Sequence, residues 1–192
     1  MVQSSAYARP RFAGHAHHVG QTLRSSDDGR SLPHISNTYP GGMHHFVSPL
    51  PPTTAFSAGM AREAIAGQLL PPWEPGRALT PDVFAPNPAF VQVMHEMIAR
   101  ESPRLPHCKT EAGRIGNGFV YVIDQRTPTP GDAVPPEDII GAFEAERGVI
   151  TKESYRPNPK HQILSARGFF CLEPKLFECL REDLISRNRG PS

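Results

Sequence analysis

The adjacent residues His107 and Cys108 are the first candidates for covalent chemistry in this sequence of 192 residues. An imidazole beside a thiol can remove the thiol proton, and the thiolate is the nucleophilic form of cysteine. The pair directly follows Pro106 and has no orienting acidic residue beside it. Because a nucleophile and its base also need a third group that orients the base, the sequence favours an ordinary loop here.

A second candidate is the pair of carboxylates at Glu144 and Glu146. On a strand, residues two positions apart point to the same face. Two carboxylates on one face repel each other, which raises the pKa of one of them and suits it for general acid–base catalysis. The alternative is a solvated strand edge with Arg147 nearby, and this alternative is favoured because charged side chains usually lie at the surface.

The nine histidines of the chain include two clusters, His15–His17–His18 and His44–His45. Imidazoles at such spacing can bind a divalent metal ion weakly. A structural or catalytic metal site needs ligands in fixed geometry, and neither cluster has a cysteine or carboxylate set beside it. No metal site is therefore expected.

Two helices are predicted in the middle of the chain. The first spans Ser57–Leu70, with Ser57 as its N-cap, and ends at two prolines. The second begins after Asn87, a good N-cap, has Pro88 in its first turn, and ends at Pro103. Residues 71–86 between them are predicted to be a proline-rich connector. The packing anchors expected in this connector are Trp73, Val83 and Phe84.

The second half of the chain predicts a strand, a hairpin and a helix. Residues 118–124, "GFVYVID", are an apolar and β-branched run after a Gly-Asn-Gly turn, which is typical of a strand. Residues 138–146 are predicted to begin with one helical turn and to continue as a strand. The turn "RG" at 147–148 then closes a hairpin. A final helix is expected over Glu173–Arg187.

The composition predicts a small α+β domain with helices flanking a short antiparallel sheet. The chain has 22 prolines and 16 glycines, and 38% of it is hydrophobic, so only part of it is expected to form a core. Residues 1–56 are predicted to be a disordered segment rich in Pro, His and Ser, and residues 57–192 the compact domain. The first 26 residues contain arginines but no acidic residue. This composition fits an organellar transit peptide, a signal for export without a classical signal peptide, or a plain disordered tail.

Charge and hydropathy exclude several classes of partner. The net charge of +1 leaves no electrostatic footprint for nucleic acid and no polybasic patch for a membrane. No run approaches the roughly 20 apolar residues of a transmembrane helix, so no membrane span is expected. The three cysteines, at positions 108, 171 and 179, match no zinc pattern and no disulfide framework.

The stretch "GFVYVID" followed by "VPPEDIIGAFE", "GVI" and "SYRPNPKH" resembles the C-terminal half of the mono-ADP-ribosyltransferase toxins of the cholera and pertussis group. The resemblance covers residues 118–161. It implies an NAD-dependent toxin or effector domain that acts on a protein target, with an NAD-sized cleft beside the strand Val120–Asp124. The family relies on an early arginine, a Ser-Thr-Ser strand and a glutamate pair.

Three departures from the family pattern follow from the same alignment. Trp73 falls near the position of the arginine that binds the dinucleotide, and Gln92, Val93 and Met94 stand for Ser-Thr-Ser. Gln125 and Thr127 fall about where the glutamate pair is expected. The resemblance therefore implies a divergent member of the family, either active or inactive, whose catalytic residues are unknown.

A non-enzymatic role is the alternative. In that interpretation the chain is a protein-binding module or an assembly subunit, and the segments "DQRTPTP" and "SYRPNPKH" are rigid recognition loops. The predicted binding residues are Asp124, Gln125, Arg126, Tyr155, Arg156, Asn158 and His161.

Overall fold

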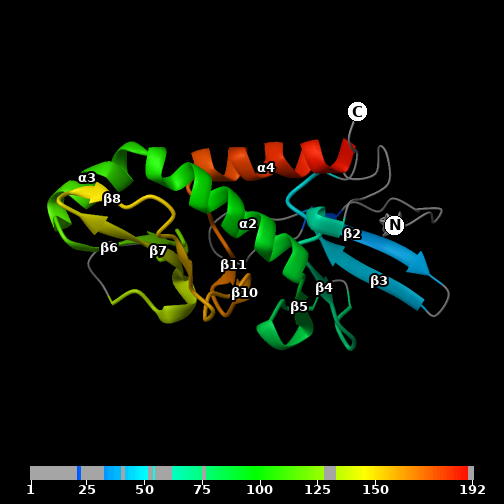
Figure 1. The fold of residues 1–192 in the computed structure, drawn as a ribbon. Helices are drawn as coiled ribbons and strands as arrows, with labels where there is room; N and C mark the ends of the chain where they lie inside the picture. Colours follow the sequence, from blue (N-terminus) through cyan, green and yellow to red (C-terminus); the bar gives the residue numbers. More distant parts are fainter. Residues whose placement is uncertain are drawn as a thin grey trace, which may run out of the picture.

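The computed structural model describes residues 21–22, 33–39, 42–51, 54, 62–74, 77–127 and 133–189. The fold is mixed α+β, as the sequence predicts, with helices packed on small antiparallel sheets. Figure 1 shows two of these sheets at opposite ends of helix α2 (Pro88–Glu101), with helix α4 (Pro174–Arg189) running beside it. One hydrophobic core connects the two ends, since it includes Val47 of the first sheet and Phe143 of the second.

The first sheet is antiparallel throughout and begins earlier in the chain than expected. Its strands, in sheet order, are β1 (Gln21–Thr22), β2 (Pro33–Tyr39), β3 (Gly42–Val47), β4 (Gly67–Leu69) and β5 (Phe84–Pro86). Val47 and Leu50 are fully buried. The domain core therefore contains residues before position 57, where the sequence places the boundary. Apart from these strands and residues 48–51 and 54, the segment 1–56 lies outside the described residues.

The prediction of a helix over residues 57–70 is wrong for residues 62–70, the part of this range that the structure describes. The chain forms a 3-10 turn η1 (Arg62–Ala64) followed by strand β4. A Cβ atom on Gly67 would lie 2.3 Å from Cζ of Phe84, so the ring packs directly on this backbone. Pairing of Gly67 with Pro86 and burial of Leu69 thus override the helical spacing of the apolar residues.

Helix α2 begins and packs as the sequence predicts. The Asn87 side chain accepts a hydrogen bond from the backbone N–H of Ala89 at 3.1 Å, and its Nδ2 donates to the carbonyls of Arg62 and Ile65. The helix continues into a 3-10 turn η3 (Ser102–Arg104). The buried face of α2 consists of Phe90, Val93, Met94, Met97 and Ile98.

The connector and its anchors are confirmed in part. Trp73 and Phe84 are buried, and Val83 packs partly buried against the same core. The connector is not entirely irregular, because a 3-10 turn η2 (Pro81–Val83) leads directly into strand β5.

The second sheet is formed by strands from the second half of the chain. Strand β6 (Gly118–Ile123) pairs with β7 (Ile139–Glu146), which also pairs with β8 (Val149–Ile150) and β9 (Arg156–Pro157). A 3-10 turn η4 (Pro136–Asp138) precedes β7, as predicted. The hairpin turn is also confirmed: Arg147 and Gly148 have φ angles of 51° and 80°, the left-handed pair that a two-residue hairpin requires.

Two further elements complete the fold. Helix α3 (Pro106–Ile115) was not predicted and lies against β6, where Ala112 packs with Val120. A short hairpin of β10 (Leu164–Ser165) and β11 (Gly168–Phe169) leads into α4, which was predicted. Ion pairs join α2 to α4, from Arg100 to Asp183 at 2.8 Å and from Arg187 to Glu96 at 3.1 Å.

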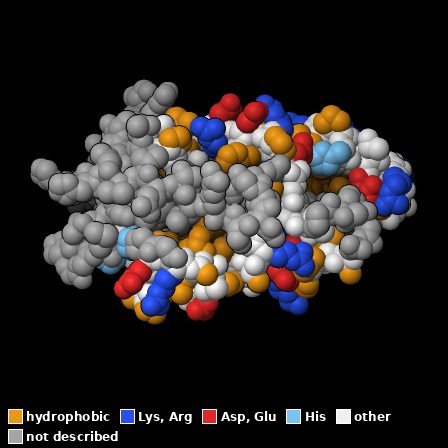
Figure 2. All heavy atoms as spheres, turned by 180° about the vertical axis from the view of Figure 1, so that it is seen from behind, with side chains coloured by type: hydrophobic (Ala, Val, Ile, Leu, Met, Phe, Trp, Pro, Cys, Tyr) orange, Lys and Arg blue, Asp and Glu red, His pale blue; other side chains and the backbone are white. Residues whose placement is uncertain are grey.

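The surface carries mixed charge. Figure 2 shows acidic and basic side chains interspersed with apolar ones over the described part of one face. None of the described helices has the length and apolar character needed to cross a membrane.

Candidate functional site

The seven predicted binding residues do not form one surface. Asp124 and Arg126 are buried inside the domain, whereas Arg156 is exposed on β9. Tyr155, Asn158 and His161 lie near helix α2. Because Arg126 lies in the interior, any effect it has on a ligand is indirect, through the position of the loops around it, whereas Asp124 also borders a cavity.

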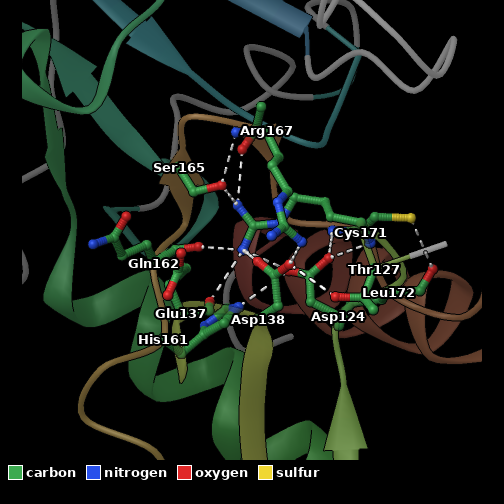
Figure 3. Close-up of polar contacts among 12 residues, drawn as sticks. Asp124, Thr127, Glu137, Asp138, His161, Gln162, Ser165, Arg167, Cys171 and Leu172 are labelled. Carbon is green, nitrogen blue, oxygen red and sulfur yellow. Dashed lines mark hydrogen bonds and ion pairs between the residues drawn. The ribbon is translucent and has the colours of Figure 1, made fainter. Parts of the chain in front are cut away.

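Arg126 is the centre of a buried polar network. Figure 3 shows Asp124, Asp138 and Ser165 among the residues of this network. Its guanidinium is 1% exposed and lies 2.9 Å from Asp124 and 3.3 Å from Asp138, two carboxylates that are fully buried. It also donates hydrogen bonds to Ser165 Oγ and to the carbonyl of Gly168, both at 2.8 Å. The network therefore ties the end of β6 to the start of β7 and to the β10–β11 hairpin.

The two carboxylates have further partners, although Asp138 Oδ1 and Arg126 Nε make no hydrogen bond within the described part of the chain. Asp124 accepts from the backbone N–H of Cys171 at 2.8 Å, and the His161 imidazole lies 3.2 Å away. Asp138 accepts from Thr127 Oγ1 and from Arg167, both at 2.9 Å. Since buried charges are tolerated only when they are paired and hydrogen-bonded, this arrangement positions the 124–127 loop firmly.

Tyr155 and Asn158 also have structural partners. Tyr155 Oη lies 2.8 Å from Nδ1 of His95 on α2, and burial raises the pKa of the phenol above its usual value. Asn158 donates from its amide to the carbonyls of Pro136 and Ile139, both at 2.7 Å. Burial, together with the nearby His161, lowers the pKa of His95 to about 4, so this imidazole is neutral at physiological pH.

A cavity of about 320 Å³ lies at the end of β6, beside the strand where the toxin resemblance places an NAD cleft. Its apolar lining residues are Val122, Ile123, Val134, Ile140, Leu172 and Leu176. Its polar lining comes from three directions: the strand end, the 124–127 loop and the residues at the starts of α3 and α4. The polar and aromatic lining residues are Tyr121, Asp124, Gln125, Thr127, His107 and Glu173.

The structure provides the orienting acid that the sequence did not reveal for His107. Glu173, which directly precedes α4, places Oε2 at 3.4 Å from His107 Nδ1. The other ring nitrogen of His107 lies 3.3 Å from the Cys108 sulfur. Both His107 and Glu173 line the cavity. The pairing was not foreseen because α3 was taken for a loop and Glu173 is remote in sequence.

Cys108 itself is unsuited to act as a nucleophile at rest. Cys108 is only 2% exposed. Burial, together with the charge of Glu173, raises the pKa of its thiol to about 11. The thiol is therefore protonated at physiological pH and donates to the imidazole. In this trio the imidazole and the carboxylate are the groups that face the cavity.

The other sequence candidates have ordinary surroundings. Glu144 forms an ion pair with Arg156 on the solvent side of the sheet, and Glu146 is exposed. Among the histidine clusters, His44 Nδ1 accepts from Gln68 Nε2 at 2.9 Å, and His45 packs edge-on against Trp73. His15, His17 and His18 lie outside the described residues. Within the described ranges, no group of three His, Cys, Asp or Glu side chains is placed to hold a metal ion.

Two larger hollows of about 780 and 960 Å³ follow the exposed side of α2. They share His95 and Pro157 in their lining, so the hollows meet at that point. The hollow of 780 Å³ is lined mostly by prolines and apolar side chains. The hollow of 960 Å³ is lined in part by charged side chains near η3, which form ion pairs.

Comparison with known proteins finds no matching family model, no matching curated protein and no matching solved structure. A functional assignment therefore depends on the geometry of the cavity beside β6 and of the hollows along α2.

Proposed function

We propose that the protein is a divergent ADP-ribosyltransferase-like effector domain that binds NAD in the cavity beside β6 and transfers ADP-ribose to a protein target. One observation carries the proposal. Gln125 and Thr127 fall where the family's glutamate pair is expected, and both line a cavity that also contains the carboxylate of Glu173. The catalytic carboxylate thus comes from a different part of the chain.

The residues fit the reacting half of the dinucleotide. A volume of about 320 Å³ lies at the lower end of the range for small-molecule pockets, roughly 300–1,000 Å³, so the cavity takes nicotinamide and its ribose rather than all of NAD. The apolar floor suits a nicotinamide ring, and the exposed ring of Tyr121 offers a stacking surface. Gln125 and Glu173 are placed to hydrogen-bond the ribose hydroxyls.

The proposed reaction breaks the bond between the ribose anomeric carbon and nicotinamide, and the bonding electrons leave with nicotinamide. The Glu173 carboxylate stabilises the positive charge that develops on the ribose in the transition state. The acceptor atom then bonds to the anomeric carbon and releases its proton to water, because the two ring nitrogens of His107 already face Glu173 and Cys108.

Two parts of the family pattern have no counterpart in the described residues. Trp73 is buried and donates from its indole to the carbonyl of Arg77, so it does not replace a dinucleotide-binding arginine. Gln92, Val93 and Met94 lie in α2 rather than on a strand. The proposal therefore rests on the cavity and its carboxylate, and it predicts weaker NAD binding than a complete site gives.

Titration calorimetry with NAD, combined with a nicotinamide-release assay, tests the proposal. The full chain is required, because Val47 and Leu50 belong to the core. Binding with release is the expected result, and Gln125→Ala should weaken binding about tenfold. Gln92→Ala is the matched control, since Gln92 lies on α2 away from this cavity. Binding without release would leave an inactive scaffold, and no binding at 1 mM NAD would contradict the proposal.

A second candidate function, binding of a protein partner, is favoured by the pair of hollows along α2. Their lining follows one side of the helix through Val91, His95 and Ala99, which gives a groove with the length of the helix. The test is Ala99→Arg, which fills the groove, compared with Thr110→Arg on the exposed side of α3. Equal partner binding by the two variants would count against this function.

A further inference from the structure

Strand β6 is apolar on both of its faces. Val120 and Val122 point inward and are 1% and 7% exposed. The alternate residues Phe119, Tyr121 and Ile123 point outward, and they are 42%, 54% and 40% exposed. We call these three residues the β6 stripe.

This pattern is unusual for a sheet with one face in water. An antiparallel strand of that kind normally alternates apolar and polar residues, and an uninterrupted apolar run is typical of a strand covered on both faces. Helix α3 covers the inner face, where Ala112 packs against Val120. The exposure of the β6 stripe shows that its own face is open, so the sequence of β6 fits a partner that covers the stripe.

The backbone of β6 is also available for pairing. Among the described residues β6 pairs only with β7, so it forms the edge of its sheet. An edge strand presents unpaired N–H and C=O groups, and an extended polypeptide can add to it as a further strand. Backbone pairing supplies affinity, and the outward side chains of the edge strand supply side-chain contacts.

The β6 stripe leads directly into the candidate site. Tyr121 and Ile123 belong to the lining of the 320 Å³ cavity, whereas Phe119 lies at the far end of the stripe. At that end the Arg156 guanidinium lies 5.9 Å from the centre of the Phe119 ring and pairs with Glu144. An apolar strip with a charged rim is the usual anatomy of a protein interface.

We propose that the β6 stripe is the docking surface for the protein acceptor, and that an extended segment of the acceptor pairs with β6 and delivers its modified side chain to the cavity. This inference rests on the proposed NAD-dependent function. It identifies the substrate class as a polypeptide that presents an unpaired extended segment, in preference to a free small-molecule acceptor. It also separates two steps, because hydrolysis of NAD by water needs the cavity alone.

The test compares two reactions of the full chain in the presence of biotin-labelled NAD. The first is nicotinamide release into buffer, with water as the acceptor. The second is transfer of biotin to the soluble proteins of a cell extract. Phe119→Asp places a charge in the β6 stripe outside the cavity lining. Leu70→Asp is the control, since Leu70 is an apolar residue 37% exposed beyond β4.

The expected result is at least a tenfold loss of transfer to protein in Phe119→Asp, with nicotinamide release unchanged and Leu70→Asp like wild type. Unchanged transfer in Phe119→Asp, with release intact, overturns the docking proposal alone. An absence of release in the wild type overturns the NAD function, and the docking proposal with it. A third outcome is that the wild type elutes as a dimer in size-exclusion chromatography and Phe119→Asp elutes as a monomer. This outcome would assign the β6 stripe to contact with a second copy of the chain and would also overturn the docking proposal. Should the aspartate variant fail to fold, Phe119→Ser replaces it with the same expectation.

Discussion

The Nδ1 atom of His107 lies 3.4 Å from a carboxylate oxygen of Glu173, and both residues line the cavity at the end of β6. The Cys108 thiol lies on the other side of the same imidazole. This relationship joins the start of α3 to the start of α4, and it gives the candidate site an oriented imidazole and a carboxylate.

The Cys108 thiol should react slowly with alkylating reagents in the folded protein. Its pKa is raised to about 11 by burial and by Glu173, and the residue is 2% exposed. Cys179 is partly exposed on α4 and serves as the internal control. Mass spectrometry after iodoacetamide treatment at pH 8 should show Cys179 modified first. Equal rates at the two thiols would contradict the burial of Cys108 beside His107.

Loss of the Arg126 guanidinium should destabilise the fold strongly. Arg126→Met leaves the buried carboxylates of Asp124 and Asp138 without their shared partner, and breaking a buried ion pair from one side costs about 3–5 kcal/mol. The free energy of unfolding from urea titration measures the effect. Arg114→Met is the matched control, because its pair with Glu111 is exposed and should contribute little. A small effect of Arg126→Met would show that the network is not a determinant of stability.

Two glycine-to-alanine changes should have opposite effects. A Cβ on Gly141 would lie 2.6 Å from Tyr155 Oη, so Gly141→Ala displaces the ring and its hydrogen bond to His95. Overpacking of this kind costs about 1–3 kcal/mol. A Cβ on Gly113, inside α3, meets open space, and Gly113→Ala should stabilise the helix by roughly 0.5–1 kcal/mol. Thermal unfolding of both variants checks the signs, and a neutral Gly141→Ala would rule out the close packing at Tyr155.

Acid should destabilise the protein through His95. The pKa of His95 is lowered to about 4 in the folded state, whereas the unfolded chain binds the proton near pH 6.5. Between these values the unfolded state holds more protons, so the free energy of unfolding falls as the pH falls. After discounting for the partial exposure of the ring, the loss from pH 7 to pH 5 is about 1 kcal/mol. His95→Gln should lose correspondingly less over this interval, and an identical loss in the two proteins would argue against a neutral His95.

The sequence predicts those elements whose signals are local. Asn87 and Pro88 mark the start of α2, and "RG" at 147–148 marks the β7–β8 turn, because capping and turn geometry depend on a few neighbouring residues. The helix expected over 57–70 was wrong because Phe84 packs on Gly67 and forces a strand there. A contact of this kind between separate segments has no local signature.

The candidate site could be predicted only in part. A cavity lies beside β6 and Gln125 lines it, but its volume of about 320 Å³ is smaller than the NAD-sized cleft expected there. Asp124 and Arg126 were expected at a recognition surface, but their pairing with Asp138 and the β10–β11 hairpin holds them in the interior. Glu173 was missed because only the packing of α3 and α4 brings it to His107.

The most direct measurement is nicotinamide release from NAD by the wild-type chain and by Glu173→Gln, with NAD affinity measured on the same samples. Glutamine retains the size and hydrogen-bonding capacity of the side chain but loses the charge that stabilises the transition state. We expect release by the wild type, a loss of at least a hundredfold in Glu173→Gln, and an NAD affinity within a few-fold of wild type. Release that is equal in the two proteins, or absent from the wild type, would contradict the assignment of the cavity beside β6 as an NAD-cleaving site.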